Sequence, residues 1–279
     1  MISNNPLKQY FRQPAIYIKL PSQGQHYPPG TLTATDTGEF PVYPMTAIDE
    51  ITYRTPDALF NGQATVNVIQ SCMPNITNAW AVPAMDIDTI LVYIRIASYG
   101  HEMEFGTRCP KCSSESDRAI DLRTVLDRIR IPNYNESVNA GDIEIYFRPM
   151  NYKNLNDNNQ LQFENQKMLQ MLPNADVTET EKMTALTAAL KKITDITVTA
   201  LAYSIATIKT PSAMVSEPEY IEDFLKNCDR NLFTRIRDHI IDLKSQAEMQ
   251  PMKLVCDECT HEYEQSVALD MSNFFAPAS

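Results

Sequence analysis

Two short cysteine motifs contain the residues of this sequence that are best suited to chemistry. Cys109 and Cys112 form one C-x-x-C pair, and Cys256 and Cys259 form a second. A C-x-x-C turn places two thiolates on one side of the backbone, and two such turns supply the four soft ligands of a tetrahedral Zn²⁺ site. Four cysteines leave no open coordination position, so such a site stabilises a fold rather than catalysing a reaction. We therefore expect a structural zinc ion bound by these four cysteines.

The sequence around the two pairs is also alike. A strand-like segment, 101–108 or 251–255, precedes the first cysteine of each pair. After the second cysteine come a Glu at the third position, a β-branched residue at the eighth and a Leu at the tenth. These are Glu115, Ile120 and Leu122 in the first copy, and Glu262, Val267 and Leu269 in the second. Each copy therefore predicts a strand, a C-x-x-C turn and a second strand, which is a zinc hairpin occurring twice.

A long segment of 143 residues separates Cys112 from Cys256. Loop closure costs only about 0.6 kcal/mol more for each doubling of length, whereas structural zinc binding supplies on the order of 10–16 kcal/mol. We therefore expect the segment to be an insertion between the two hairpins of one zinc ribbon. Two other interpretations stay open, a redox-active C-x-x-C, which would fit better beside a βαβ pattern, and two unrelated surface pairs.

The elements that must position the hairpins divide the sequence into five segments. We expect an extended, β-rich N-terminal arm (1–50), a helical segment (51–100), the first zinc hairpin with further β structure (101–150), a helical insertion (151–250), and the second zinc hairpin with a C-terminal tail (251–279). Short strands are indicated at 15–20 and 40–43. The predicted fold class is α+β, with a small β-rich N-terminal region and a split four-cysteine zinc-ribbon-like β module that carries a large, mostly helical insertion.

Helix boundaries before the first cysteine pair are marked by acidic residues, proline and glycine. Pro56 and Asp57 suit the start of a helix. Asp86 and Asp88 load the first turn of the next helix, which Gly100 ends. We interpret these two carboxylates as helix-start and surface charges rather than as an acid–base pair.

The insertion, residues 151–248, is predicted to be almost wholly helical. Thr178 and Glu181 have the spacing of a capping box, and Asp229 can cap the last helix. An apolar stripe follows each signal at steps of three and four residues. The stripes are Met183, Leu186, Leu190 and Ile193, and Phe233, Ile236, Ile240 and Leu243. Such stripes predict faces that pack in a core or against a partner helix.

Composition excludes several classes of function. The chain of 279 residues has 24 Lys and Arg against 35 Asp and Glu, a net charge of -11, which counts against direct nucleic-acid binding through phosphate contacts. Its seven glycines form neither G-x-G-x-x-G nor a P-loop. The N-terminus is polar, and the longest apolar stretch, 196–208, is too short to span a bilayer. We expect no membrane span and a soluble protein that is intracellular where it is made.

No combination of side chains in the sequence predicts an active site. The four histidines form no H-E-x-x-H motif, and there is no G-x-S-x-G. His101 and His261 flank the cysteine turns, as donors to the sulfurs, alternate ligands or simple surface residues. His239 is expected to be solvated, and Cys72 and Cys228 to be small buried hydrophobes. We therefore expect a protein that is not an enzyme.

An ordered set of turn and cap motifs runs through residues 16–125. It comprises 20–28 (LPSQGQHYP), 42–50 (VYPMTAIDE), 56–62 (PDALFNG), 72–76 (CMPNI), and 86–88 (DID) before the helix that ends at Tyr99-Gly100. As an ordered set, it resembles the T4-type contractile-tail phage baseplate family. That family includes a central hub subunit, often labelled a baseplate hub assembly chaperone.

The resemblance implies a non-enzymatic component of a contractile phage tail baseplate that acts through protein–protein contacts. It would be a central hub subunit or a hub assembly factor, with other baseplate hub and wedge or tail proteins as partners and with several copies conceivable in one baseplate. Its location would be the virion tail baseplate, after synthesis in the host cytoplasm.

Two alternatives come from other classes of protein. One is a zinc-ribbon regulatory protein that binds a transcription complex, and the other is a thiol oxidoreductase. The proline-rich N-terminal segment also has two interpretations, an arm that orders on a neighbouring subunit and a loop packed on its own domain.

Overall fold

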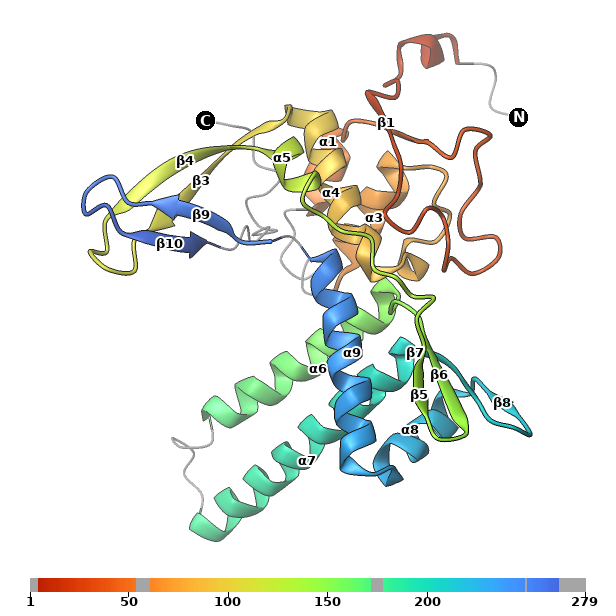
Figure 1. The fold of residues 1–279 in the computed structure, drawn as a ribbon. Coiled ribbons are helices and arrows are strands. Elements are labelled where there is room, and N and C mark those ends of the chain that lie inside the picture. Colours follow the sequence, from red (N-terminus) through yellow and green to blue (C-terminus); the bar gives the residue numbers. More distant parts are fainter. Residues whose placement is uncertain (1–4, 54–60, 172–177, 249, 266–279) are drawn as a thin grey trace. The chain divides into compact units, whose positions relative to one another are not determined.

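A computed structural model of the chain describes residues 5–53, 61–171, 178–248 and 250–265 (Figure 1). The fold is α+β, as the sequence predicts. It forms two compact units: unit 1 comprises Met1–Ala79, Asp86–Arg130 and Glu248–Ser279, and unit 2 comprises Trp80–Met85 and Ile131–Ala247. The helix start predicted at Pro56-Asp57 and the repeat positions Val267 and Leu269 lie outside the described residues.

Unit 1 begins with a 3-10 helix, η1 (Pro6–Tyr10), and a two-stranded antiparallel sheet of β1 (Ile16–Ile18) and β2 (Phe40–Val42). Both strands predicted in this region are therefore confirmed. They form because β-branched and aromatic residues lie between proline- and glycine-rich turns, and because their inward side chains, such as Ile18 and Val42, are buried.

Arg12 fastens the N-terminal segment to the helices of unit 1. Its guanidinium donates to the carbonyl oxygen of Pro44, to both oxygens of Ser71 at 2.7 Å, and lies 3.3 Å from the carboxylate of Asp49. Because an Arg can satisfy several acceptors at once, this single side chain holds three separate segments together. From Arg12 onward, the structure therefore favours a loop packed on its own unit over a free arm.

The helices of this part of the chain are α1 (Ala47–Tyr53), α3 (Gln63–Cys72), the 3-10 helix η2 (Ala79–Ala81), α4 (Ala84–Tyr99) and α5 (Leu122–Leu126). The prediction of a helix that begins near Asp86 and ends at Gly100 is confirmed. Gly100 has φ 88°, the left-handed conformation that glycine adopts most readily after a helix. Ile90, Leu91 and Ile94 are fully buried, so α4 is a central element of the core of unit 1.

Asp86 is buried, and the prediction that it is a surface charge is wrong. Its carboxylate accepts hydrogen bonds from the backbone N–H of Ser22 at 2.8 Å, from the Ser22 hydroxyl at 2.5 Å and from the Tyr27 hydroxyl at 2.9 Å. The loop around residues 21–27 therefore folds over the first turn of α4. Burial raises the pKa of Asp86 to about 6, although the three hydrogen bonds oppose that shift.

Replacement of Asp86 by Asn is expected to change how stability depends on pH. The folded-state pKa of about 6 lies above the ordinary 3.8, so the stability that the protonated group contributes is complete below pH 3.8 and is lost as pH rises through 6. That difference in pKa corresponds to about 3 kcal/mol. Denaturant unfolding at several pH values should therefore show wild type losing stability relative to Asp86→Asn as pH rises toward neutrality. Parallel curves for the two proteins would contradict this role.

Two antiparallel hairpins carry the cysteine pairs, as the sequence predicts. The first joins β3 (Glu102–Arg108) to β4 (Glu115–Asp121), and the second joins β9 (Met252–Val255) to β10 (Glu262–Gln265). Both return strands begin at the glutamate found three residues after the second cysteine. The repeat in the sequence is thus a repeat in the structure.

The described residues of unit 2 include a four-stranded antiparallel sheet in the order β5-β6-β7-β8 and the helices α6 to α9. The strands are β5 (Val138–Ala140), β6 (Ile143–Phe147), β7 (Ile205–Lys209) and β8 (Met214–Val215), and the helices are α6 (Tyr152–Met171), α7 (Glu179–Ser204), α8 (Pro218–Asn227) and α9 (Arg230–Ala247). The prediction of an almost wholly helical stretch at 151–248 is wrong at β7 and β8. The segment after Ser204 contains the β-branched residues Ile205 and Ile208, which favour a strand. It forms one because β6 supplies the hydrogen-bonding partners of its backbone.

The helix signals within unit 2 are confirmed. Thr178 and Glu181 form the predicted capping box at the start of α7, and Asp229 accepts from two N–H groups in the first turn of α9. The apolar stripe of α9 (the α9 stripe: Phe233, Ile236, Ile240 and Leu243) lies in the core, with Ile236 fully buried and Leu243 4% exposed. The apolar stripe of α7 (the α7 stripe: Met183, Leu186, Leu190 and Ile193) is exposed instead. The sequence does not reveal this difference between the two stripes.

His239 does not have the solvated position that the sequence suggests. Its ring lies 4.5 Å from the ring of Phe147, and its Nε2 atom is buried. The reason is its place on α9 between Ile236 and Ile240, which both face the core of unit 2.

Among the described helices, none combines the length and hydropathy that a membrane crossing requires.

Candidate metal centre

The two C-x-x-C turns have the same backbone conformation. In each, the N–H of the first cysteine donates to the carbonyl oxygen five residues later, and the N–H four residues later donates back to the first cysteine, at 2.9 Å in one hairpin and 3.0 Å in the other. The residue after the second cysteine, Ser113 or Thr260, has a φ of 60° or 54°. A residue other than glycine rarely adopts the left-handed conformation. Its occurrence at the same position in both turns therefore indicates that the two turns are of one type.

The turns bring all four cysteine sulfurs together. The four Sγ atoms lie within 4.8 Å of one another, and the separations are 3.7 Å for Cys109–Cys259 and 3.6 Å for Cys112–Cys256. Four sulfurs at about 2.3 Å from a central Zn²⁺ form a tetrahedron with edges of about 3.8 Å. A disulfide would require about 2.05 Å. The donor set and its spacing therefore fit a tetrahedral metal ion.

Sulfurs of different hairpins lie 3.7 Å apart for Cys109–Cys259 and 3.6 Å apart for Cys112–Cys256. A redox-active C-x-x-C needs only the two sulfurs of its own turn. The arrangement is thus one shared site rather than two separate dithiols.

The environment of Cys109 favours the thiolate that a metal requires. The backbone N–H of Cys112 has the largest effect and, with the N–H of Lys111, lowers the pKa of the Cys109 thiol, although desolvation opposes the shift. The neighbouring sulfurs of Cys259, Cys109 and Cys256 raise the pKa of the Cys112 thiol in turn. Cys109 and Cys256 are buried, Cys259 is half-buried and Cys112 is exposed. The site is thus closed on the side of the first cysteine of each pair and open to solvent at Cys112.

Arg118 joins the two hairpins beside the cysteines. This β4 side chain donates from Nη2 to the carbonyl oxygen of Val255 at 2.8 Å, and the same atom lies 2.6 Å from the carboxylate of Asp257 in the second C-x-x-C turn. This contact cannot be predicted from the sequence, because Arg118 and Val255 are 137 residues apart and meet only in the tertiary structure. Arg118 therefore holds the second turn in place against the first.

Loss of the Arg118 side chain is expected to weaken metal binding without removing a ligand. Residues that orient metal ligands typically change affinity by about 10–100-fold, so Arg118→Met should raise the dissociation constant for Zn²⁺ about tenfold. Competition with a chromophoric chelator measures this change. The matched control is Arg123→Met, because Arg123 pairs only locally with Asp121, at 2.6 Å. Equal affinities in the two variants would show that Arg118 does not position the site.

Other predicted site residues lie outside the cluster. Among the described residues, the group of potential metal ligands here comprises the four cysteines, without His101 or His261. His261 takes part through its carbonyl oxygen, which accepts from the N–H of Cys256. Cys72 is buried beside Arg12, and burial raises the pKa of its thiol to about 12; Cys228 is half-buried. Neither of these two thiols reaches the cluster.

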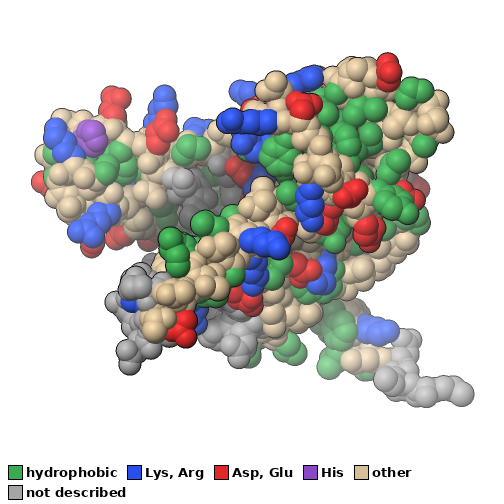
Figure 2. All heavy atoms as spheres, turned by 90° about the horizontal axis from the view of Figure 1, so that it is seen from below, with side chains coloured by type: hydrophobic (Ala, Val, Ile, Leu, Met, Phe, Trp, Pro, Cys, Tyr) green, Lys and Arg blue, Asp and Glu red, His purple; other side chains and the backbone are tan. Residues whose placement is uncertain are grey.

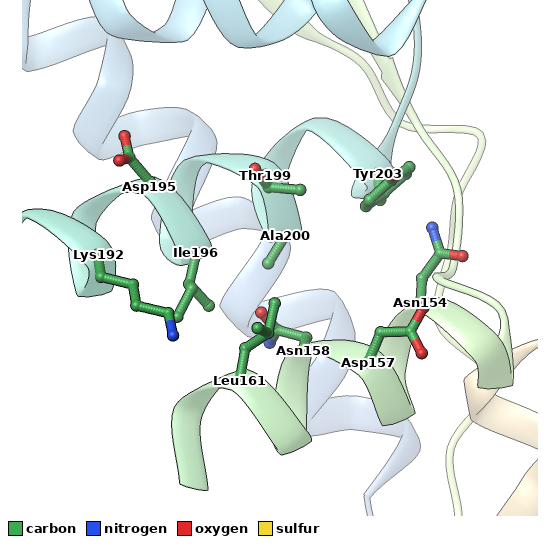
Figure 3. A pocket seen from close by; sticks show the side chains of 10 residues that line it. All are labelled: Asn154, Asp157, Asn158, Leu161, Lys192, Asp195, Ile196, Thr199, Ala200 and Tyr203. Carbon is green, nitrogen blue, oxygen red and sulfur yellow. The ribbon is translucent and has the colours of Figure 1, made fainter. Parts of the chain in front are cut away.

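A pocket lies within unit 2, between α6 and α7. The pocket has a volume of about 400 Å³. Figure 3 shows Asn158 and Leu161 of α6 facing Ile196 and Ala200 of α7 across it. Both carboxylates at its rim have cationic neighbours, Asp157 with Lys153 at 2.5 Å and Asp195 with Lys226 at 4.0 Å. Figure 2 shows one face of the whole molecule, on which basic and acidic side chains are interspersed.

A comparison with known protein families finds one family model that matches this chain. The family model described as "T4 bacteriophage base plate protein" matches residues 19–276. No curated protein and no solved structure matched the chain. The matched range includes both cysteine pairs and the helices of unit 2.

Proposed function

Because the chain belongs to the T4 bacteriophage base plate protein family, we propose that it is a non-enzymatic component of a contractile phage tail baseplate, as a central hub subunit or a hub assembly factor. The observation that carries this proposal is the extent of the match, residues 19–276. A zinc-ribbon regulator that shared only its ribbon with other proteins would be expected to match over the hairpins alone. Here the match also includes the long insertion and the segment before the first hairpin.

We also propose that Zn²⁺ is the resident metal, bound by Cys109, Cys112, Cys256 and Cys259. The sulfur spacing near 3.7 Å and the all-thiolate donor set support this choice. A bound zinc ion would supply folding free energy and no catalysis, since four protein ligands leave it no position for a substrate. The chain's own contribution is the paired turns and Arg118, which bring the thiols together.

The proposed partners are other hub, wedge and tail proteins of the same virion, contacted through protein surfaces in the tail baseplate. The direct test is infection with a phage that lacks this gene, with and without the gene supplied from a plasmid. We expect infected cells to accumulate particles without functional baseplates, and the plasmid copy to restore them. Normal tails in the absence of the gene would contradict a baseplate role, and a change in viral transcription alone would indicate the regulator.

A further inference from the structure

One of the four clustered cysteines faces solvent. Cys112 is exposed, whereas Cys109 and Cys256 are buried and Cys259 is half-buried. A small oxidant in solution therefore meets the Cys112 sulfur first. A metal-bound cysteine is a thiolate, and the thiolate is the form of the side chain that peroxides oxidise. Cys112 is thus the point at which an oxidant reaches the cluster.

The cysteine sulfurs of the two hairpins face one another in pairs. Cys112 and Cys256 lie 3.6 Å apart, and Cys109 and Cys259 lie 3.7 Å apart. Together the two pairs use every sulfur of the cluster once. Because a disulfide bond is about 2.05 Å long, the sulfurs of each pair need to approach by about 1.6 Å to form one. Cys256 is therefore placed to react with an oxidised Cys112.

A contact that involves no sulfur also holds the two hairpins together. Arg118 of the first hairpin donates to the carbonyl oxygen of Val255 at 2.8 Å and lies 2.6 Å from the carboxylate of Asp257, both on the second hairpin. This bridge consists of protein atoms alone and does not require a metal ion. We therefore expect the facing sulfurs to stay close while the thiolates are being oxidised.

We propose that a peroxide replaces the metal ion of this cluster by two disulfides between the hairpins, Cys112–Cys256 and Cys109–Cys259; this inference rests on zinc as the proposed resident metal. The Cys112 thiolate attacks the peroxide, whose O–O bond breaks, so that Cys112 becomes a sulfenic acid and a hydroxide ion leaves. The Cys256 thiolate then attacks the oxidised sulfur. The S–S bond forms as the S–O bond breaks, and a second hydroxide ion leaves.

The second pair of sulfurs reacts with a second peroxide in the same way. Four thiolates and two peroxides give two disulfides and four hydroxide ions, and each peroxide accepts the two electrons that one disulfide gives up. The Zn²⁺ ion passes to the solvent, because a disulfide sulfur is no longer a thiolate ligand. The hairpins therefore stay joined, first through the metal and then through covalent bonds. Such an exchange suits a chain that is made in a reducing cytoplasm and is carried in a virion, as proposed, to an environment in which disulfides persist.

The test uses the purified full-length protein after removal of reductant. Hydrogen peroxide is added in steps, a chromophoric chelator reports released zinc, and peptide mass spectrometry without reduction identifies each disulfide. About one equivalent of zinc should be released, with Cys112–Cys256 as the first disulfide and Cys109–Cys259 as the second. The control is Cys228→Ser, which removes a thiol outside the cluster and should give the same zinc release and the same disulfides.

Thermal unfolding supplies a second measurement. The oxidised protein should melt at a higher temperature than reduced protein from which a chelator has removed zinc, because Cys112 and Cys256 are 144 residues apart and a link between them restricts a long loop of the unfolded chain. Disulfides within the turns, Cys109–Cys112 and Cys256–Cys259, would leave the hairpins unlinked and give no such increase.

Three results would overturn the proposal: zinc that stays bound after oxidation, disulfides within the turns, and oxidation without any disulfide. Reduced protein that holds no zinc would contradict the zinc assignment separately. The disulfide pattern of that protein would still decide the pairing, since links between the hairpins support the redox site and links within the turns contradict it.

Discussion

The Cys109→Ser protein is expected to purify with little zinc and to lose several kcal/mol of stability. A structural zinc site contributes roughly 10–16 kcal/mol, so the loss is expected to be at least the equal share of one of four ligands, about 2.5–4 kcal/mol. Because the sulfurs of Cys109 and Cys256 lie in one cluster, Cys256→Ser should have the same effect, although Cys256 lies on the other hairpin. Zinc content measured by elemental mass spectrometry, together with denaturant unfolding, checks both effects in one preparation.

The control for this experiment is Cys228→Ser. Cys228 is a half-buried thiol outside the cluster, and it donates to the carbonyl oxygen of Leu225 at 3.6 Å. This variant should retain full zinc content. If Cys109→Ser and Cys256→Ser both keep wild-type zinc content and wild-type unfolding, the four-thiolate site is wrong.

Ile236→Asp is expected to unfold unit 2. Ile236 is fully buried in the cluster that packs α9 against the sheet and against α7 and α8. The substitution removes about 2–3 kcal/mol of apolar burial and places a carboxylate in a site with no partner, for a total cost of about 5 kcal/mol or more. That cost approaches the entire stability of a typical domain. Loss of helical circular dichroism and rapid proteolysis within residues 131–247 are the expected readouts.

A matched control for that substitution lies on the same helix. Ile241 is 56% exposed, so Ile241→Asp changes the same side chain to the same charge at the surface. Its helical signal and protease resistance should remain those of wild type. Equal resistance in Ile236→Asp would mean that the α9 stripe is not part of the core that stabilises unit 2.

Local signals in the sequence were sufficient for the two cysteine turns and for many helix ends. The C-x-x-C turns, the glutamates that start each return strand, and the Thr178–Glu181 capping box depend on residues a few positions apart. Such features are determined by backbone geometry within one turn, and they appear in the structure where the sequence places them.

Features that depend on distant partners could not be predicted. β7 follows an apolar run that suits a buried helix equally well, and its strand form depends on pairing with β6, about 60 residues earlier. Asp86 carries the mark of a helix start, but its burial depends on the loop that contains Ser22 and Tyr27. Arg118 resembles any surface arginine until the second hairpin is placed beside it. In each case the missing information is tertiary.

The two apolar stripes show the same limit. The α7 and α9 stripes have comparable spacing, yet Ile236 is fully buried and Leu190 is 54% exposed. Periodicity reveals that a helix has an apolar side, but the surrounding elements decide whether that side is covered.

The most direct test of the account is quantitative mass spectrometry of purified, tail-intact virus particles and of baseplate assembly intermediates from infected cells. We expect the chain to be present in a fixed ratio to other baseplate proteins. It would be in the particles if it is a hub subunit, and in the intermediates alone if it is an assembly factor. Absence from both fractions, with recovery on RNA polymerase instead, would contradict the baseplate role and indicate a transcriptional regulator.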